Sequence, residues 1–187
     1  MSVIDLKAGI DWTVIEDALA MKTDILLMQY IIALNLRVIG LKDNKGYNLI
    51  HLSVLAMKAD AIHALVHYAR DTQKEPREAI ESWLNERSDK DKFTPLHFAS
   101  FKGHFATIQA LIDHGADPLL ENDSGLNVLH LAAQGDAARS VYLFIKEKNI
   151  DINKRDHFGG TPLHWACHNN SEMALTFLLA WNPDINI

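Results

Sequence analysis

A six-residue segment that occurs twice constrains the fold of this chain more than any other feature. Thr94-Pro95-Leu96-His97-Phe98-Ala99 returns as Thr161-Pro162-Leu163-His164-Trp165-Ala166, and residues 127–132 and 48–53 are two more divergent copies. The histidines of the four copies are separated by 46, 33 and 34 residues; they are His51, His97, His130 and His164. A period near 33 residues is typical of stacked helical units, each too small to bury its own apolar face.

The residues before each copy indicate a turn that leads into a helix. An aspartate or asparagine lies eight positions before each histidine, at Asp43, Asp89, Asn122 and Asp156. Glycine follows three residues later at Gly46, Gly125 and Gly159, and Lys92 takes that place in the second copy. Thr94 and Thr161 are favourable N-cap residues, and each is followed by proline at the first helical position, where a missing N–H costs nothing.

This pattern resembles the ankyrin repeat, whose signature is Thr-Pro-Leu-His-x-Ala in units of about 33 residues. The resemblance covers residues 41–187 and implies an all-α ankyrin-repeat solenoid, in which helix–turn–helix units are joined by β-turn fingertips. We expect units at 41–87, 88–121, 122–155 and 156–187. Within them, residues 105–113 and 172–181 are expected to form second helices.

Two regions depart from the regular period. The first spacing leaves about 13 additional residues within 70–87, where Ala79, Ile80, Trp83 and Leu84 share one helical face. We therefore expect an inserted helix near 74–87, packed on the stack, rather than a disordered linker. Residues 1–40 lack the motif but contain two segments of helical period, 12–22 and 24–35, so we expect a degenerate N-terminal capping repeat there.

The C-terminal edge has no polar capping unit, and such units keep repeat stacks soluble. The sequence reaches Ile187 where a further unit would begin. We therefore expect this edge to contact further repeats or another subunit. Trp165 and Trp181 are either core residues of the edge or contacts for a following repeat, and we favour the second interpretation.

Composition limits the classes of partner. The 187 residues contain 18 Lys and Arg against 24 Asp and Glu, a net charge of −6 without a basic block, which argues against nucleic-acid binding. The single cysteine, Cys167, excludes an internal disulfide and a cysteine-rich zinc site. No signal peptide is evident, and the most apolar run, 25–36, is too short to span a bilayer. We expect a cytoplasmic chain without direct membrane insertion.

The histidines do not form a pattern typical of catalysis or metal binding. One motif histidine per unit gives a spacing of about 10 Å, so these four residues cannot share an ion, and we expect each to bridge backbone groups of adjacent turns. His164 and His168 have the spacing of half a zinc site without its glutamate, and His63 and His67 have no evident third ligand. Phosphate-loop and nucleophile motifs are absent. We expect no catalytic, metal or cofactor site, and a buried Cys167.

Apolar and aromatic residues at positions expected to be exposed indicate a binding surface. In an ankyrin stack, the fingertips and the inner face of each first helix form a concave surface whose residues are ordinarily small or polar. The candidates for partner binding are Tyr47, Phe93, Phe101, Leu126, Gln134, Phe158 and His168. Aromatic anchors dominate binding hot spots, although packing between fingertips or scattered exposed apolar residues would also account for them.

Residues 125–136 and 160–181 are similar to a narrower group, the N-terminal ankyrin domains of Asp-His-His-Cys palmitoyltransferases. In that family the stack recruits protein substrates for a membrane domain. The chain has no Asp-His-His-Cys motif and no transmembrane helix, so the resemblance implies recognition and not catalysis. We therefore expect a non-catalytic module that binds a peptide or protein partner. The alternatives are the substrate-recruiting part of a membrane-bound palmitoyltransferase and a structural subunit of a larger assembly.

Overall fold

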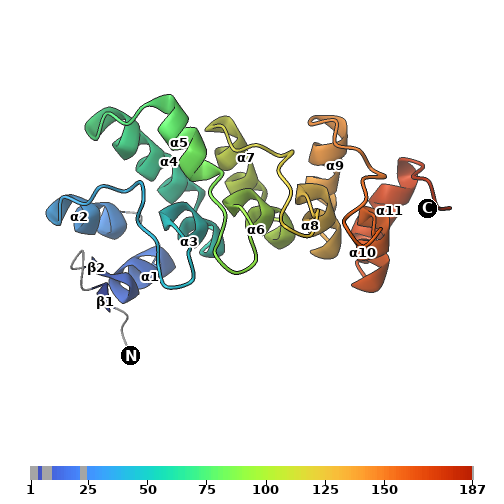
Figure 1. Cartoon of the computed structure of the whole chain (residues 1–187), viewed down its shortest axis with the longest axis horizontal. Coiled ribbons are helices and arrows are strands. Elements are labelled where there is room, and N and C mark those ends of the chain that lie inside the picture. Colours follow the sequence, from blue (N-terminus) through green and yellow to red (C-terminus); the bar gives the residue numbers. More distant parts are fainter. Residues whose placement is uncertain (1–3, 6–9, 22–24, 187) are drawn as a thin grey trace.

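The computed structural model describes residues 4–5, 10–21 and 25–186, which form an elongated stack of short α-helices in two layers (Figure 1). The first helices of the units are α3 (Leu49–Leu55), α6 (Pro95–Lys102), α8 (Val128–Gln134) and α10 (Pro162–His168). The second helices are α4 (Ala59–His67), α7 (Phe105–Asp113), α9 (Ala138–Lys146) and α11 (Glu172–Ala180). Consecutive first helices pack α3 on α6, α6 on α8 and α8 on α10. This is the all-α repeat solenoid that the sequence predicts.

Local capping determines where the first helices begin. The residue before each of them accepts backbone N–H groups through its side chain; these residues are Asn48, Thr94, Asn127 and Thr161. The motif histidine three positions later accepts the N–H of the capping residue itself, which completes a capping box. At the other end of α6, Gly103 adopts a φ of 64°, the left-handed conformation that ends a helix.

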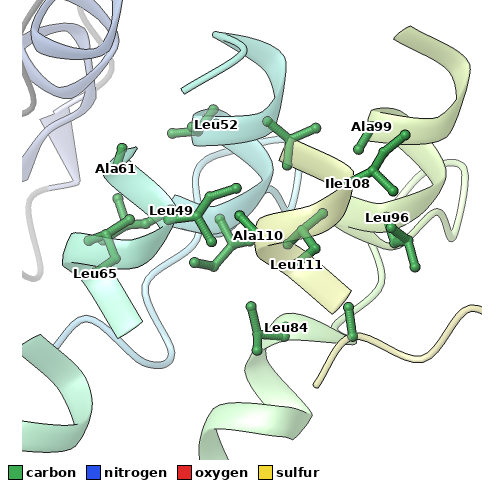
Figure 2. Packing of buried hydrophobic residues seen from close by; sticks show 14 of the residues in the cluster. Leu49, Leu52, Ala61, Leu65, Leu84, Leu96, Ala99, Ile108, Ala110 and Leu111 are labelled. Atoms are coloured by element: carbon green, nitrogen blue, oxygen red, sulfur yellow. The ribbon is translucent and has the colours of Figure 1, made fainter. Parts of the chain in front are cut away.

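The core is continuous between neighbouring units. The equivalent residues of the four second helices are fully buried; they are Leu65, Leu111, Phe144 and Leu178. Figure 2 shows Leu49 and Leu65 of one unit beside Leu96 and Leu111 of the next. Burying one such side chain contributes roughly 1.5–3 kcal/mol, and much of that burial comes from the adjacent unit, so cohesion is between neighbours.

The insert forms a compact addition beside the second-helix layer. Tyr68–Thr72 continues α4 as a π-helix, η1, and Arg77–Leu84 forms α5. Ile80, Trp83 and Leu84 are buried, which explains the apolar face seen in the sequence. Next to them, the side chain of Asn85 donates to the Gly115 carbonyl at 3.1 Å and accepts the N–H of Asp117 at 2.8 Å. These bonds tie the insert to the loop that follows α7.

The N-terminal region also contributes two helices, α1 (Trp12–Ala20) and α2 (Ile25–Ala33). Strands β1 (Ile4–Asp5) and β2 (Ile10–Asp11) pair antiparallel before them. α1 contacts α3 and α2 contacts α4. The two helices lie in the segments of helical period, while residues 22–24 are outside the described part of the chain. That residues 1–40 form a capping repeat, and that the units have the bounds given above, remain predictions.

Candidate protein-binding surface

A row of hydrogen-bonded histidines connects consecutive units. The Nε2–H of each histidine donates to a backbone carbonyl of the next unit, with distances of 3.1, 3.1 and 3.3 Å for the pairs His51–Phe93, His97–Leu126 and His130–Gly160. A carbonyl can only accept, so the proton lies on Nε2 in all three rings. Each acceptor residue directly precedes the N-cap of its unit. The expectation that motif histidines bridge the backbone of adjacent turns is confirmed for these three.

Burial keeps these imidazoles neutral. It lowers the pKa of His51 and of His97 to about 4, and it also lowers the pKa of His130. Both ring nitrogens are engaged, Nδ1 by the N-cap N–H and Nε2 by a carbonyl, so no lone pair is available to a metal or a substrate. Within the described residues, no three His, Cys, Asp or Glu side chains lie together as metal ligands.

The fingertip turns are held by side chains at their first residue. Oδ1 of Asp43, of Asn122 and of Asp156 each accepts two backbone N–H groups of its own turn, at 2.8–3.0 Å. In the second unit Ser88 takes this role, because its Oγ accepts the N–H of Phe93 at 3.2 Å. The assignment of Asp89 to this position is therefore wrong. That turn is one residue longer, and Lys92 adopts its positive φ of 54°.

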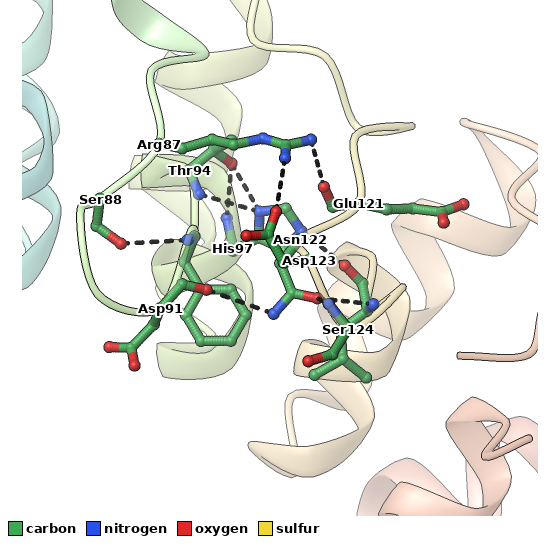
Figure 3. Close-up of polar contacts among 11 residues, drawn as sticks. Arg87, Ser88, Asp91, Thr94, His97, Glu121, Asn122, Asp123 and Ser124 are labelled. Atoms are coloured by element: carbon green, nitrogen blue, oxygen red, sulfur yellow. Dashed lines mark hydrogen bonds and ion pairs between the residues drawn. The ribbon is translucent and has the colours of Figure 1, made fainter. Parts of the chain in front are cut away.

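Polar contacts between successive fingertips fix their spacing (Figure 3). The Arg87 guanidinium donates to Asp123 at 3.2 Å and to the Glu121 carbonyl at 2.6 Å. One unit further, the backbone N–H of His157 donates to the Ser124 carbonyl at 2.9 Å. These contacts present the fingertips as one connected edge beside the first helices.

Three of the predicted binding residues are exposed. Phe101 is 44% exposed and Phe158 is 86% exposed, and His168 is also exposed. Phe101, Gln134 and His168 occupy equivalent positions on α6, α8 and α10, with Gln134 half-buried. We call this row, together with Leu55 at the equivalent position of α3, the first-helix face.

Tyr47 and Phe93 are half-buried rather than fully exposed. They belong to a small aromatic cluster. Both rings meet Phe98 edge-on, with ring centroids 5.5 Å and 5.6 Å away. Both fingertip rings thus pack on the first helix α6, through Phe98. Sequence reasoning missed Phe98, although its place directly after a motif histidine was a usable signal.

The expectation that Leu126 is exposed is wrong. It is 7% exposed. Its N–H donates to Asn122 at 2.9 Å and its carbonyl accepts from His97, so its backbone is fixed from both sides between two units. The residue directly before an N-cap is therefore part of the contact between units wherever the motif histidine of the preceding unit donates to its carbonyl.

The expectation that Cys167 is buried is also wrong, since its side chain is exposed. The equivalent residues Val54, Ser100 and Ala133 are buried because the next first helix covers them. No helix covers α10 on that side within the described residues. A cavity of about 350 Å³ lies there instead, lined by Asp156, Phe158, Gly160, His164, Trp165 and His168.

Trp165 is held in that cavity by a hydrogen bond. Its indole N–H donates to Asp156 at 2.8 Å. Burial alone would raise the pKa of Asp156, but the bonds from Trp165 and from the backbone of Gly160 and Phe158 outweigh it and lower that pKa. Trp181 is 37% exposed near Tyr142, with ring centroids 6.3 Å apart.

A third histidine joins the predicted pair on α4. Nδ1 of His63 lies 2.8 Å from Nε2 of His114, the residue directly after α7, and the His67 ring meets His114 edge-on. Burial, and then the neighbouring His63, His67 and Arg70, lower the pKa of His114. No residue pattern predicts this contact, because 51 residues separate His63 from His114.

Comparison with known proteins places these features in context. The family described as "Ankyrin repeats (3 copies)" matches residues 18–122 and 116–187. Palmitoyltransferase AKR1 of Lachancea kluyveri is 30% identical over 95 residues, 49% of this chain and 13% of that protein. Palmitoyltransferase ZDHHC13 of Homo sapiens is 35% identical over 95 residues, 50% of this chain and 15% of that protein.

A third relative is the transient receptor potential cation channel subfamily A member 1 of Homo sapiens, 32% identical over 107 residues, 57% of this chain and 10% of that protein. The chain thus spans between 10% and 15% of the length of these three relatives. No helix among its described residues has the length and apolar character that crossing a membrane requires.

Proposed function

Because the chain belongs to the ankyrin-repeat family, we propose that it binds a peptide or protein partner, without catalysis, along its first-helix face and fingertips, the concave surface of the stack. The observation that carries this proposal is the exposure of two phenylalanines, Phe101 at 44% and Phe158 at 86%. Large rings that desolvate on contact are the usual anchors of protein interfaces.

The arrangement of polar groups supports binding over chemistry. The three inner motif histidines are neutral and fully hydrogen-bonded, so they stabilise the contacts between units. The polar groups left at the surface, such as Gln134 and His168, lie in a row with Phe101 and can select a partner by hydrogen bonding.

The test compares two exposed aromatic sites on opposite layers. Phe101 and Tyr142 are 44% and 43% exposed, and Tyr142 lies on the second helix α9. Three immobilised chains capture proteins from a lysate of the source organism: the wild type, the double variant Phe101→Ala/Phe158→Ala, and Tyr142→Ala. Quantitative mass spectrometry then measures the amount of each captured protein. With the double variant, we expect the captured amount of the wild type's partners to fall at least about tenfold, the effect of losing about 1.4 kcal/mol of binding free energy. With Tyr142→Ala, the captured amount should stay at the wild-type level.

Equal capture by all three chains would contradict the proposed surface. Circular dichroism and urea unfolding of each variant serve as the folding control, because both phenylalanines are exposed and their removal leaves the core intact. His168→Ala and Gln134→Ala, tested singly, extend the map along the first-helix face.

A second candidate function is favoured by the names of two relatives. Palmitoyltransferases AKR1 and ZDHHC13 match half of this chain, so it could be the substrate-recruiting part of a membrane-bound palmitoyltransferase. An antibody against residues 88–187 distinguishes the two cases after cell fractionation. A larger polypeptide in the membrane pellet supports this candidate, and a 21.0 kDa band in the cytoplasmic fraction contradicts it while supporting a cytoplasmic location. A structural subunit would instead elute from a size-exclusion column as part of a large complex.

A further inference from the structure

A cavity of about 460 Å³ lies where the insert meets the second-helix layer. We call it the insert cleft. Its lining comes from α4, η1, α5 and the end of α7, and its main residues are Val66, Arg70, Arg77, Ile80, Asp113 and His114. Binding sites for small molecules usually measure about 300–1,000 Å³ and combine apolar walls with a few convergent polar groups. The insert cleft has both properties.

The charges that line the insert cleft are mainly positive. Val66 and Ile80 are buried and supply apolar surface, while Arg70 on η1 and Arg77 at the start of α5 supply two guanidinium groups. Asp113 is the single carboxylate among the lining residues that the structure describes, and its Oδ1 already accepts a hydrogen bond from Gln109 at 2.7 Å. On a chain with a net charge of −6, this lining favours an anionic ligand.

Each guanidinium is oriented by a carboxylate of its own segment and keeps donors to spare. Nε and Nη2 of Arg70 donate to Asp71 at 2.8 Å and 3.2 Å, and Nε of Arg77 donates to Glu81 at 2.6 Å. Among the described residues, Nη1 of Arg70 and both Nη atoms of Arg77 have no acceptor. Ion pairs this exposed contribute little. A phosphate or carboxylate can therefore use the remaining donors in the paired geometry that arginine favours.

His114 adds a third polar group to the insert cleft. Its Nε2 is bonded to His63, and its Nδ1 has no hydrogen-bond partner in the part of the chain that the structure describes. The lowered pKa of His114, caused first by burial, is a further indication, because titratable groups with shifted pKa values inside a cavity are typical of ligand sites. The wall that carries Arg70 is a π-helix, a local structure that occurs frequently at functional sites.

We propose that the insert cleft binds an anionic group, a phosphate or a carboxylate, attached to a small apolar body. The anion lies between Arg70 and Arg77 and accepts a hydrogen bond from Nδ1 of His114, and the apolar body packs on Val66 and Ile80. The site is a product of the insert, because η1 and α5 supply both arginines. The insert cleft lies on the second-helix layer, so the proposal does not depend on partner binding by the first-helix face.

Three small aromatic probes separate the contributions of charge and apolar contact: phenyl phosphate, benzoate and the uncharged benzyl alcohol. The full chain, labelled with ¹⁵N, is titrated with each probe, and the backbone amide signals of His114 and Gly115 in NMR spectra give the dissociation constants. We expect saturable shifts with both anions and at least about tenfold weaker binding of benzyl alcohol, which cannot form charge-assisted hydrogen bonds. The anion that binds more tightly identifies whether the insert cleft prefers a phosphate or a carboxylate.

Two substitutions with opposite expected effects sharpen the test. Arg70→Gln should weaken the binding of phenyl phosphate about tenfold, because it removes charged donors. Asp113→Asn should strengthen it about threefold, because it removes the carboxylate from the lining. Arg155→Gln removes the same positive charge from an exposed position in the turn before α10. It is the matched control and should leave the dissociation constant unchanged.

Three results would overturn the proposal. The first is the lack of a saturable shift with either anion, and the second is benzyl alcohol binding as tightly as phenyl phosphate. The third is an equal effect of Arg70→Gln and Arg155→Gln, which would mean that general surface charge attracts the anion. Circular dichroism of each variant is the folding control. If Arg70→Gln does not fold, Arg77→Gln replaces it, since the side chain of Arg77 is 86% exposed.

Discussion

The tetrapeptide Thr-Pro-Leu-His occurs in two different environments in this chain. Residues 94–97 and 161–164 form the same capping box at the start of α6 and α10. His97 is fully buried and donates to Leu126, whereas His164 is exposed. The difference lies in the neighbour, since α8 covers the side of α6 that carries His97 and no described helix covers the same side of α10. In this fold the motif determines local geometry, and the next unit determines burial.

The largest expected difference between the two sites is in stability. His97→Ala leaves the Leu126 carbonyl and the Thr94 N–H without partners and opens a cavity, so we expect it to lower the free energy of unfolding by about 4 kcal/mol. His164→Ala removes only the bond to Thr161 and should cost under about 1 kcal/mol. Urea unfolding followed by circular dichroism measures both, and equal losses would show that the neighbour does not matter.

Acid should weaken the inner interfaces through the same histidines. The folded-state pKa of His51 and of His97 is about 4, below the ordinary 6.5, so the unfolded chain binds more protons between these values and stability falls as pH falls through that window. From pH 7 to pH 5 the two residues together should cost about 4 kcal/mol of unfolding free energy. Urea midpoints at both pH values measure this, and a constant midpoint would contradict buried neutral histidines.

The smallest expected effect separates two residues that the sequence placed together at the fingertips. Leu126 is 7% exposed and Phe158 is 86% exposed. Leu126→Ala should therefore lower the free energy of unfolding by about 2 kcal/mol, and Phe158→Ala should change it by no more than about 0.5 kcal/mol. Thermal and urea unfolding of the pair provide the measurement. A large loss at Phe158 would mean that it supports the stack.

Much of the fold follows from local sequence. The bounds of α7, Phe105–Asp113, are those predicted, and α11, Glu172–Ala180, ends one residue earlier than expected. Capping residues and apolar periodicity act within one helix, so the bounds of a helix can be predicted from its local sequence. The π-helix η1 is different, because it arises where α4 continues into the insert and no local residue pattern indicates it.

The candidate surface was predicted only in part, because exposure is a property of the neighbours. Phe101 and Phe158 are exposed as expected, whereas Leu126 is buried and Cys167 is exposed, the reverse of the expectations. The contact of His63 with His114 depends on how α4 packs on α7. Packing of this kind links residues far apart in sequence and cannot be read from one motif.

The ring N–H protons of the four motif histidines test the central claim most directly. In a proton NMR spectrum with each histidine assigned by substitution, the Nε2–H signals of His51, His97 and His130 should be visible and exchange slowly with water, because each is buried and bonded to a carbonyl. The exposed ring of His164 should give no such signal. Protection of His164 in the isolated chain, or its absence at the three inner histidines, would contradict the conclusion that each unit completes the one before it.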